Sequence, residues 1–575
     1  MATKWQDANL FERIMIRQGE MVAERLPYEK DFEDIIEIFN PGLSEFQETA
    51  DKKRIRDTFN GTPASALRIM SDGMQGSIVS RSIDWLKYTM PQPFFKGVDE
   101  VIEWLQATED HMLDVYARSG FYACLGPYFR SALSVGTPAL ISEENILTGK
   151  IECTLPHPRE NYFRFDSFGV PVQYHRRFKK TLTQLQIELK QRQIDYKEVL
   201  SPATQTAIKN GLNTDVEVMQ VYYREDDPIF DGLTFSGQFG DIKPDRPWRM
   251  YLLEVGADGG VAGNKKPFEA SGYWARPHAV WRYEISTDEI YARTPAWYSL
   301  HDARGEIIAS KTLMEAGQGY VEPQYFASSD MRGKIRRKPR STTYAKTAES
   351  FVKEMPQGGK NYPIGEKERD RIVNNVERWF DVQYYQMIIR NMMSGGSPQT
   401  ATAWIGAQGE NALLRGTNIQ RVVDDALTPI DDTFFSIELN AGRMPEPPDV
   451  ILEMTDGQVD AEFIGPLLQA QKKAFAVRRY FEGKGVIDGH IETFPQDVHK
   501  IKSEQLLEKT LEAIGFDMNS INSKEEFAEI MADIAARERQ KEALEAGSQI
   551  ADAVPKLSKP VEPNSPIAAI AEGVG

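Results

Sequence analysis

The segment MRGKIRRKPRSTTYAK, residues 331–346, is the most chemically distinctive stretch of the sequence. It places seven lysines and arginines in sixteen positions. Gly333 and Pro339 favour an irregular, exposed backbone over a helix. Such a segment fits an electrostatic docking surface for an acidic partner, a transient phosphate contact, or a solvated loop without a partner. The residues that would form the docking surface are Arg332, Lys334, Arg336, Arg337, Lys338 and Arg340.

The charge of the whole chain limits what this segment does. The sequence holds 68 lysines and arginines against 85 aspartates and glutamates, a formal net charge of −17. A surface of that sign repels phosphates, so the chain does not wrap nucleic acid with its whole surface. Any contact with nucleic acid is therefore expected to be local or weak.

A second candidate, GADGGVAGNKK at 256–266, resembles a phosphate-binding loop only at first glance. A Walker loop needs Gly-Lys followed by Ser or Thr, whereas here Asn264 follows Gly263 and Pro267 follows the lysines. The flanking segments have strand patterns, which favours a hairpin turn. The sequence therefore predicts no ATP-driven motor.

No catalytic constellation is evident elsewhere. The seven histidines show no zinc-site spacing, and no serine lies in a GxSxG elbow. His157 and His175 flank β segments and are interpreted as structural histidines. The pairs Asp424/Asp425 and Asp431/Asp432 are expected on a solvated helix face. Cys124 and Cys153 are the only cysteines, and two free thiols are favoured over one disulfide. We expect no metal and no cofactor.

Hydrophobic periodicity indicates the elements that hold these residues. A chain of 575 residues should form several domains. Helical spacing covers 6–40 and 63–135, two antiparallel strand groups lie between about 137 and 285, and 181–213 between them is helical. Further helices are expected over 297–314, 365–393, 400–440, 463–482 and 500–545. Pro429 should kink the helix over 400–440. A strand is expected at DVILEMT (449–455). The N-terminus does not resemble a signal peptide, and no apolar run would span a membrane, so the protein is expected to be soluble.

Several motifs resemble the portal (head–tail connector) proteins of short-tailed, T7-like bacteriophages (podoviruses). YARTPAWYSLHDARGEIIASKTLMEAGQGYVEP is similar to the entry into that family's first stem helix. TATAWIGAQGENALL and LTPIDDTFFSIELNAGRMPEPP resemble its Thr-Ala-Thr helix start, helical proline and proline-rich exit. AEFIGPLLQAQKKA is similar to its Gly-Pro-Leu helix, and PHPRENYFRFDSFGVPVQYHRRFKKTLTQL to its strand–turn–strand unit before a helix. The resemblance covers roughly 150–485, in the family's order.

The resemblance implies an α+β subunit with a helical and β wing, a two-helix stem, a small α/β clip, a long kinked helix and a helical crown. The implied regions are a wing over 1–296 (helical in 1–135, mixed β in 136–296), a first stem helix over 297–319, a clip over 320–363, a second stem helix over 364–393, a tunnel loop over 394–399, a kinked wing helix and returning wing segment over 400–485, a crown over 486–550 and a disordered tail over 551–575.

The implied function is structural: a dodecameric ring at one capsid vertex, through which double-stranded DNA is packaged and ejected. The implied partners are other copies of the chain, DNA, the terminase motor, tail adaptors, and the major capsid and scaffolding proteins, without a membrane. The protein is then made in the host cytoplasm and resides in the virion. Ser394, Gly395, Gly396, Ser397, Pro398 and Gln399 would face the channel, and the basic segment would lie in the clip. The alternative is an unrecognised DNA-binding or nucleotide-hydrolysing protein of DNA packaging.

Overall fold

The computed structural model describes residues 9–43, 60–82, 84–91, 98–145, 148–230, 246–256, 267–286, 289–321, 325–329, 352–354, 362–386, 418–454, 459–465 and seven positions between 483 and 537. The chain divides into two compact units, Met1–Gln471 and Lys472–Gly575. Every helix and strand named below belongs to the first unit.

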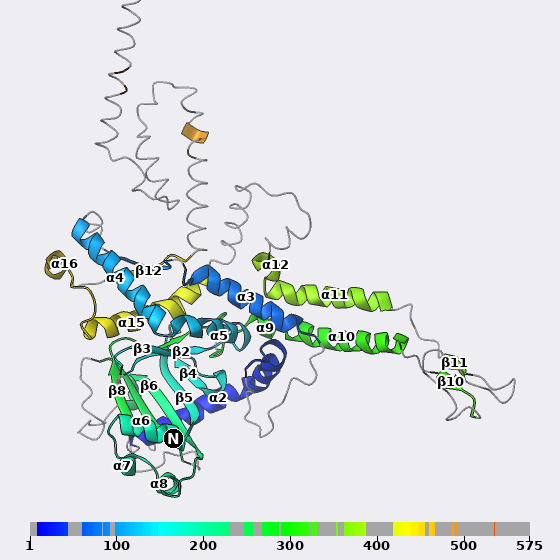
Figure 1. Cartoon of the computed structure of the whole chain (residues 1–575), viewed down its shortest axis with the longest axis horizontal. Coiled ribbons are helices and arrows are strands. Elements are labelled where there is room, and N and C mark those ends of the chain that lie inside the picture. The colour runs from blue at the N-terminus through cyan, green and yellow to red at the C-terminus, as the bar shows by residue number, and fades with distance from the viewer. Residues whose placement is uncertain are drawn as a thin grey trace, which may run out of the picture. The chain divides into compact units, whose positions relative to one another are not determined.

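Helices dominate the N-terminal part (Figure 1). They are α2 (Leu10–Phe39), α3 (Thr62–Ile78), α4 (Asp99–Arg118) and α5 (Phe121–Ser134). A capping box between Asn9 and Glu12 starts α2, since each side chain accepts a hydrogen bond from the backbone N–H of the other. Buried side chains of α3, α4 and α5 share the largest hydrophobic core with Phe434 far along the chain, on which Tyr116 stacks at 4.4 Å between ring centroids.

Two antiparallel sheets follow. The three-stranded sheet has the order β3-β2-β9, and the five-stranded sheet the order β4-β5-β6-β7-β8. Their bounds are β2 Ala139–Glu144, β3 Ile151–Thr154, β4 Asn161–Phe165, β5 Pro171–Thr181, β6 Asp215–Arg224, β7 Trp248–Glu254, β8 Glu269–Tyr273 and β9 His278–Val280. The connection from β5 to β6 contains α6 (Leu182–Gln191), α7 (Tyr196–Val199) and α8 (Pro202–Lys209).

Strand β6 shows why the five-stranded sheet is covered on both faces. Val218 and Tyr222 share a core with Leu182, Leu185 and Leu189 of α6. Met219, Val221 and Tyr223 share another with Leu10, Phe11 and Ile14 of α2. Successive side chains of a strand point to opposite faces, so both sets are buried.

A helical hairpin follows the sheets (Figure 1). The short α9 (Pro295–Tyr298) leads into α10 (Leu300–Val321), and α11 (Tyr362–Trp379) returns beside it and is followed by α12 (Val382–Tyr385). Between them, β10 (Tyr325–Ala327) pairs with β11 (Val352–Glu354) in antiparallel register. Figure 1 shows α10 and α11 running side by side, with the two short strands beyond their ends.

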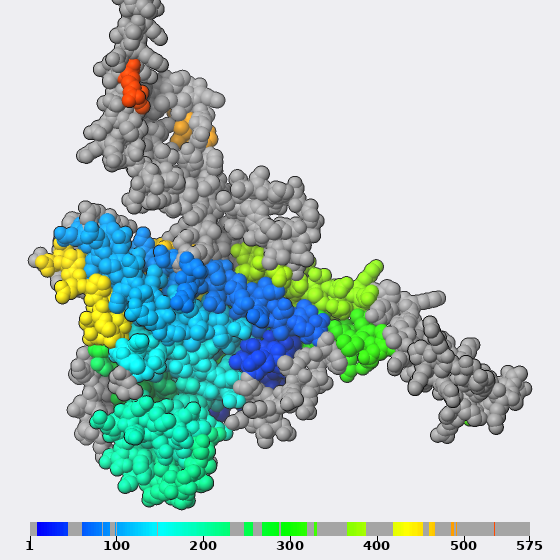
Figure 2. Space-filling view, in the orientation of Figure 1, coloured from blue at the N-terminus to red at the C-terminus, as the bar shows by residue number. Residues whose placement is uncertain are grey.

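The last described segments return to the N-terminal helices. A π-helical turn, η6 (Val423–Leu427), runs into α15 (Thr428–Asn440), and α16 (Asp449–Met454) precedes β12 (Asp460–Phe463). Strand β12 pairs with β1 (Leu86–Thr89), and the indole N–H of Trp104 donates to the Pro445 carbonyl oxygen at 3.1 Å. In Figure 2 this C-terminal stretch, in yellow, lies against the blue N-terminal helices.

The mixed helix and strand composition expected from the sequence is confirmed, but two helix predictions are too long. The expected helix over 181–213 is three short helices, with Gln193 in the left-handed region at φ 60°. The expected helix over 365–393 ends at Trp379, and Asp381 takes φ 51°. The reversal at Asp381 buries both neighbours, Phe380 and Val382, in the largest core. The burial of Phe380 and Val382 therefore interrupts the helix that the spacing of apolar residues predicts.

Two strand predictions are also wrong. DVILEMT forms α16 instead of a strand, because Ile451 packs into a small core with Met90 and Val101. The strand of this region is β12, and its partner β1 was not predicted. The second strand group, expected to reach about residue 285, has its last strand at His278–Val280.

Candidate functional site at the base of a helical hairpin

The two helices of the hairpin approach closely through glycine. A Cβ atom built on Gly365 of α11 would lie 3.0 Å from Cδ2 of Leu313 on α10. Nearer the base, a Cβ on Gly305 would lie 3.9 Å from Cδ1 of Ile372, an ordinary contact. The absence of a side chain at Gly365 therefore lets Leu313 fill the space between the helices.

A buried polar contact ties the hairpin to the N-terminal helices. Glu306 of α10 is 0% exposed and accepts a hydrogen bond from the Asn60 amide, which also donates to Ser310 Oγ at 3.2 Å. The Asn60 amide oxygen accepts from the backbone N–H of Thr62 at 3.1 Å, at the start of α3. Burial raises the pKa of Glu306. Asn60 thus joins the first turn of α3 to the buried carboxyl of α10.

Two further contacts fix the hairpin base. Arg304 of α10 forms an ion pair with Asp34 of α2. The ring of Tyr385, on α12, occupies the space over Gly73 of α3, where any Cβ would overlap the ring. The hairpin is therefore attached at both of its helices.

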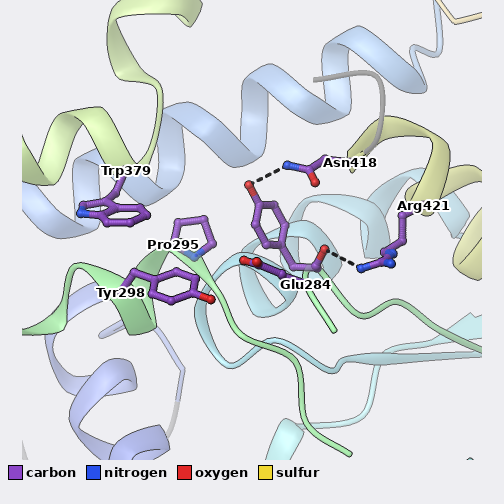
Figure 3. Close-up of a pocket in the computed structure, with 7 residues that line it drawn as sticks. Glu284, Pro295, Tyr298, Trp379, Asn418 and Arg421 are labelled. Atoms are coloured by element: carbon purple, nitrogen blue, oxygen red, sulfur yellow. Dashed lines mark hydrogen bonds between the residues drawn. The ribbon is translucent and has the colours of Figure 1, made fainter. Parts of the chain in front are cut away.

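A pocket of about 370 Å³ lies at this base. Figure 3 shows its walls, which come from the segment after β9, from α9, from the end of α11 and from the helix before η6. The lining residues are Tyr283, Glu284, Pro295, Tyr298, Trp379, Asn418 and Arg421. The pocket therefore gathers the segments that enter and leave the hairpin.

Stacked rings and hydrogen bonds hold the pocket walls together. Tyr298 and Trp379 stack with centroids 5.2 Å apart, although Trp379 remains 45% exposed. The Asn418 amide donates to the Tyr283 hydroxyl at 3.0 Å, and Arg421 donates to the Tyr283 carbonyl oxygen at 3.5 Å (Figure 3). Burial, and next the nearby carboxylate of Glu284, raise the pKa of Tyr298. The seven lining residues include one carboxylate, Glu284, and one guanidinium, Arg421.

A buried carboxyl lies further along the same helical segment. Asp431 of α15 accepts hydrogen bonds from the hydroxyls of Tyr116, at 2.8 Å, and Tyr88, at 2.9 Å. Burial raises its pKa to about 7. The expectation of a solvated carboxylate face is wrong here, because Asp431 is 2% exposed and joins β1, α4 and α15. Its partners come from positions more than three hundred residues away, so no local sequence signal marks them.

Close to the predicted kink at Pro429, the segment has a π-helical turn, Val423–Leu427, directly before the helix that begins at Thr428. A π turn inserts one residue into the helical repeat and is often found at functional sites. Asp425, within the turn, is half-buried, and burial raises its pKa while the Arg282 guanidinium opposes that rise. In the pair Asp424/Asp425, Asp424 is exposed, as expected, and only Asp425 is half-buried.

Of the residues predicted to act, the described ranges hold only some. The basic residues Arg332, Lys334, Arg336, Arg337, Lys338 and Arg340, and the loop residues Ser394, Gly395, Gly396, Ser397, Pro398 and Gln399, lie outside them, as do 256–266 except for its first residue. The two histidines interpreted as structural are so in the structure. His175 is buried between Gln18 and Tyr223, and His157 accepts from the Arg159 N–H.

Neither cysteine lines the pocket at the hairpin base. Cys124 and Cys153 are free, as expected, and burial raises the pKa of Cys153 to about 12. Within the described ranges, no group of three histidine, cysteine, aspartate or glutamate side chains could hold a metal ion. No helix in those ranges combines the length and the apolar character that crossing a bilayer requires.

Known proteins resemble the chain over almost its full length. The family described as "Bacteriophage head to tail connecting protein" matches residues 12–521. A protein named "Portal protein" from Salmonella phage epsilon15 is 23% identical over 577 residues, covering 98% of each chain. A protein named "Probable portal protein" from Bordetella phage BPP-1 is 22% identical over 564 residues, covering 95% of this chain and 94% of that one.

Solved structures give weaker likenesses. A chain in the neck of an empty GTA particle, computed with C6 symmetry, is 9% identical with a TM-score of 0.35, covering 73% of this chain and 86% of that chain. A chain from the virion of a native gene transfer agent (GTA) particle is 10% identical with a TM-score of 0.33, covering 75% and 87%. Both TM-scores lie below 0.5.

Proposed function

The chain belongs to the family of bacteriophage head-to-tail connecting proteins, and from this premise we propose that it forms a ring-shaped channel for double-stranded DNA at one capsid vertex. The observation that carries this proposal is the family match from residue 12 to residue 521. The protein is a portal-type head–tail connector. We propose in addition that the chain forms a ring, that the ring has twelve subunits and that it encloses a channel.

The hairpin of α10 and α11 supports ring formation. It exposes large apolar side chains that its own chain leaves uncovered: Ile308 is 65% exposed and Met314 is 48% exposed on α10, and Trp379 is 45% exposed at the end of α11. Large exposed apolar side chains favour burial against another molecule. A head-to-tail contact that closes on itself produces a ring. We therefore assign the hairpin as the stem and β10–β11 as part of the clip.

The charge of the chain supports a sliding channel. With a net charge of −17, its surface repels DNA phosphates on average, so ion pairs that would hold a moving duplex are few. The uncharged residues Ser394 to Gln399 form the tunnel loop in this proposal, and would meet DNA through small polar groups and backbone. The basic residues from Arg332 to Arg340 form the clip surface, which binds the terminase motor and later the tail adaptors.

The role proposed is structural and not enzymatic. The capsid and scaffolding proteins are the remaining partners proposed, and the virion vertex is the proposed location. The pocket between Tyr298 and Arg421 would then transmit movement of the stem to the kinked helix, because both contribute its walls. The wing, in this proposal, is the body formed by the two sheets and the N-terminal helices.

Electron microscopy of the purified chain tests the proposal. We expect end-on class averages with a central hole, and light scattering that reports an assembly of many subunits. A monodisperse species of about 65 kDa across salt conditions, the mass of one chain, would overturn it. ATP hydrolysis by the purified chain, with or without DNA, would favour the nucleotide-hydrolysing alternative instead.

A further inference from the structure

A groove of about 760 Å³ lies between the two sheets and shares no lining residue with the pocket at the hairpin base. Its walls come from β2 and β3 of the three-stranded sheet, from β5 to β8 of the five-stranded sheet, and from the C-terminal end of α6. Strand β8 is a terminal strand of its sheet, so one wall of the groove is a sheet edge. Neither the pocket at the hairpin base nor the proposed channel uses this surface.

Glu143 is held in this groove in an unusual way. Its Oε1 atom accepts three hydrogen bonds, from the Tyr222 hydroxyl at 2.5 Å, the Gln220 amide at 3.0 Å and the Tyr273 hydroxyl at 3.1 Å. All three donors are neutral. No described residue donates a hydrogen bond to Oε2, and Glu143 is partly exposed and lines the groove. One oxygen of the carboxylate is therefore fixed, and the other is presented to the groove.

The cations of the groove are already committed to other carboxylates. Arg176 donates to Glu160 at 3.0 Å, Lys180 to Glu188 at 2.6 Å, and Arg192 pairs with Glu269. Arg176 and Lys180 also lie over the ring of Phe178, which fixes their positions further. Each of the three cations therefore forms its ion pair with a carboxylate other than Glu143.

The remaining carboxylates of the groove have partners as well. Glu144 pairs with Arg443 at 3.0 Å, and Glu152 accepts from the Asn145 amide at 2.9 Å. The walls carry five carboxylates against three cations, so the lining is acidic by two charges. Burial raises the pKa of Glu143, which reflects the cost of enclosing a carboxylate without its own cation. A cation delivered from outside would remove that cost.

We propose that the groove binds an extended basic segment of another protein, with one arginine side chain seated on Oε2 of Glu143. Ile194 and Tyr273 line the groove and are partly exposed, so Ile194 offers apolar surface to the methylene stem and Tyr273 an aromatic side chain to the guanidinium. The terminal strand β8 lets an extended backbone run along its edge. The proposal does not depend on ring formation.

The test uses the full chain and a pair of matched pentapeptides as probes. One is acetyl-Thr-Val-Arg-Val-Thr-amide, and the other replaces arginine with citrulline, its neutral isostere. Affinities are measured by isothermal titration calorimetry at about 0.15 M salt, where the Debye length of about 8 Å screens unspecific attraction to the acidic surface. We expect the arginine peptide to bind at least about tenfold more tightly, or about 1.4 kcal/mol.

Three variants locate the effect. Glu143→Gln keeps an acceptor for the three donors but removes the charge, and should abolish the preference for arginine over citrulline. Ser271→Tyr places a ring in the groove and should weaken both peptides, and it carries the test if Glu143→Gln does not fold. Glu100→Gln removes an equal charge from an exposed position of α4 and should bind as the original chain does.

Several outcomes would overturn the proposal. These are equal or undetectable binding of the two peptides to the original chain, an arginine preference that survives in Glu143→Gln, and weakening by Glu100→Gln to the same degree. Dispersal of the assembly by Glu143→Gln, with its fold intact, would show that a second copy of the chain occupies the groove instead.

Discussion

The ring of Tyr298 lies on the indole of Trp379, with planes 17° from parallel and centroids 5.2 Å apart. Tyr298 ends α9, which leads into the hairpin, and Trp379 ends α11, which leads out of it. The stack therefore closes the hairpin at its base, where the pocket also lies. The base of the hairpin is joined to the body by this closure, by the contacts of Glu306 and Arg304, and by the Tyr385 ring over Gly73.

We predict that Trp379→Ala lowers the free energy of unfolding of the first unit by about 1 kcal/mol, because a stacked aromatic pair contributes about 0.5–1.5 kcal/mol beyond its buried area. Trp379→Phe, which keeps a ring on Tyr298, should lose less than half as much. The measurement is chemical denaturation followed by circular dichroism. Equal losses in the two variants would show that the stack itself is unimportant.

Three glycines give a graded series. Gly305→Ala should raise the melting temperature slightly, because its Cβ meets Ile372 at 3.9 Å and alanine favours helices by up to about 1 kcal/mol. Gly365→Ala should be near neutral, since Leu313 at 3.0 Å must yield. Gly73→Ala should cost about 1–3 kcal/mol, because the Tyr385 ring must move. Calorimetry would reveal the order, and a reversed order would contradict the packing described.

Asp431 should make stability depend on pH. Burial raises its pKa from 3.8 to about 7, so the folded state holds this proton more tightly than the unfolded state. The resulting stabilisation is complete below about pH 4 and is lost as the pH rises through about 7. Asp431→Asn should therefore flatten the dependence of unfolding free energy on pH in that window, by up to about 1.4 kcal/mol per pH unit.

The matched control is Asp424→Asn, at an exposed position of the same helical segment. Unfolding midpoints from pH 4 to pH 8 would be compared for the three proteins. A slope left unchanged by Asp431→Asn would mean that this carboxyl does not titrate in the window.

We predict that replacing Arg336, Arg337, Lys338 and Arg340 by glutamine leaves assembly intact but weakens docking of a motor or adaptor protein. Charges of one sign on an exposed segment steer association and lose effect as salt rises. The control replaces Arg68 and Arg118, which are exposed on other helices. Loss of assembly in the quadruple variant would place this segment in a contact between subunits.

Deletion of Ser394 to Ser397 should spare assembly and impair DNA packaging or retention, if these residues reach into the channel. A variant with alanine at all four positions keeps the length of the segment. It shows whether DNA packaging needs that length or the side chains of Ser394 to Ser397. Packaged DNA would be measured in particles complemented with each variant. Full packaging by the deletion variant would refute the tunnel-loop proposal.

The sequence predicts many local elements in which one face of a helix or strand is buried, although β1 and α16 are exceptions. The strands from Ala139 to Thr181 and the helix pair on either side of the basic segment appear from periodicity alone. Asp381 could not be predicted, because its left-handed backbone depends on the burial of Phe380 and Val382 in a core assembled from distant residues. Asp431 and Glu143 were missed for the same reason, since the tyrosines around them come from other segments.

The pairing of β1 with β12 has a consequence for how the protein is made. Thr89 and Asp460, opposite each other in that pair, are 371 positions apart. A ribosome adding about 5–20 residues per second needs roughly 20–75 s between them. During that time Leu86 to Thr89 lack their strand partner, and Asp431, between Tyr88 and Tyr116, arrives only shortly before it. The N-terminal helices therefore cannot complete their core until β12 has been made, and the body of the subunit closes only after most of the chain has left the ribosome.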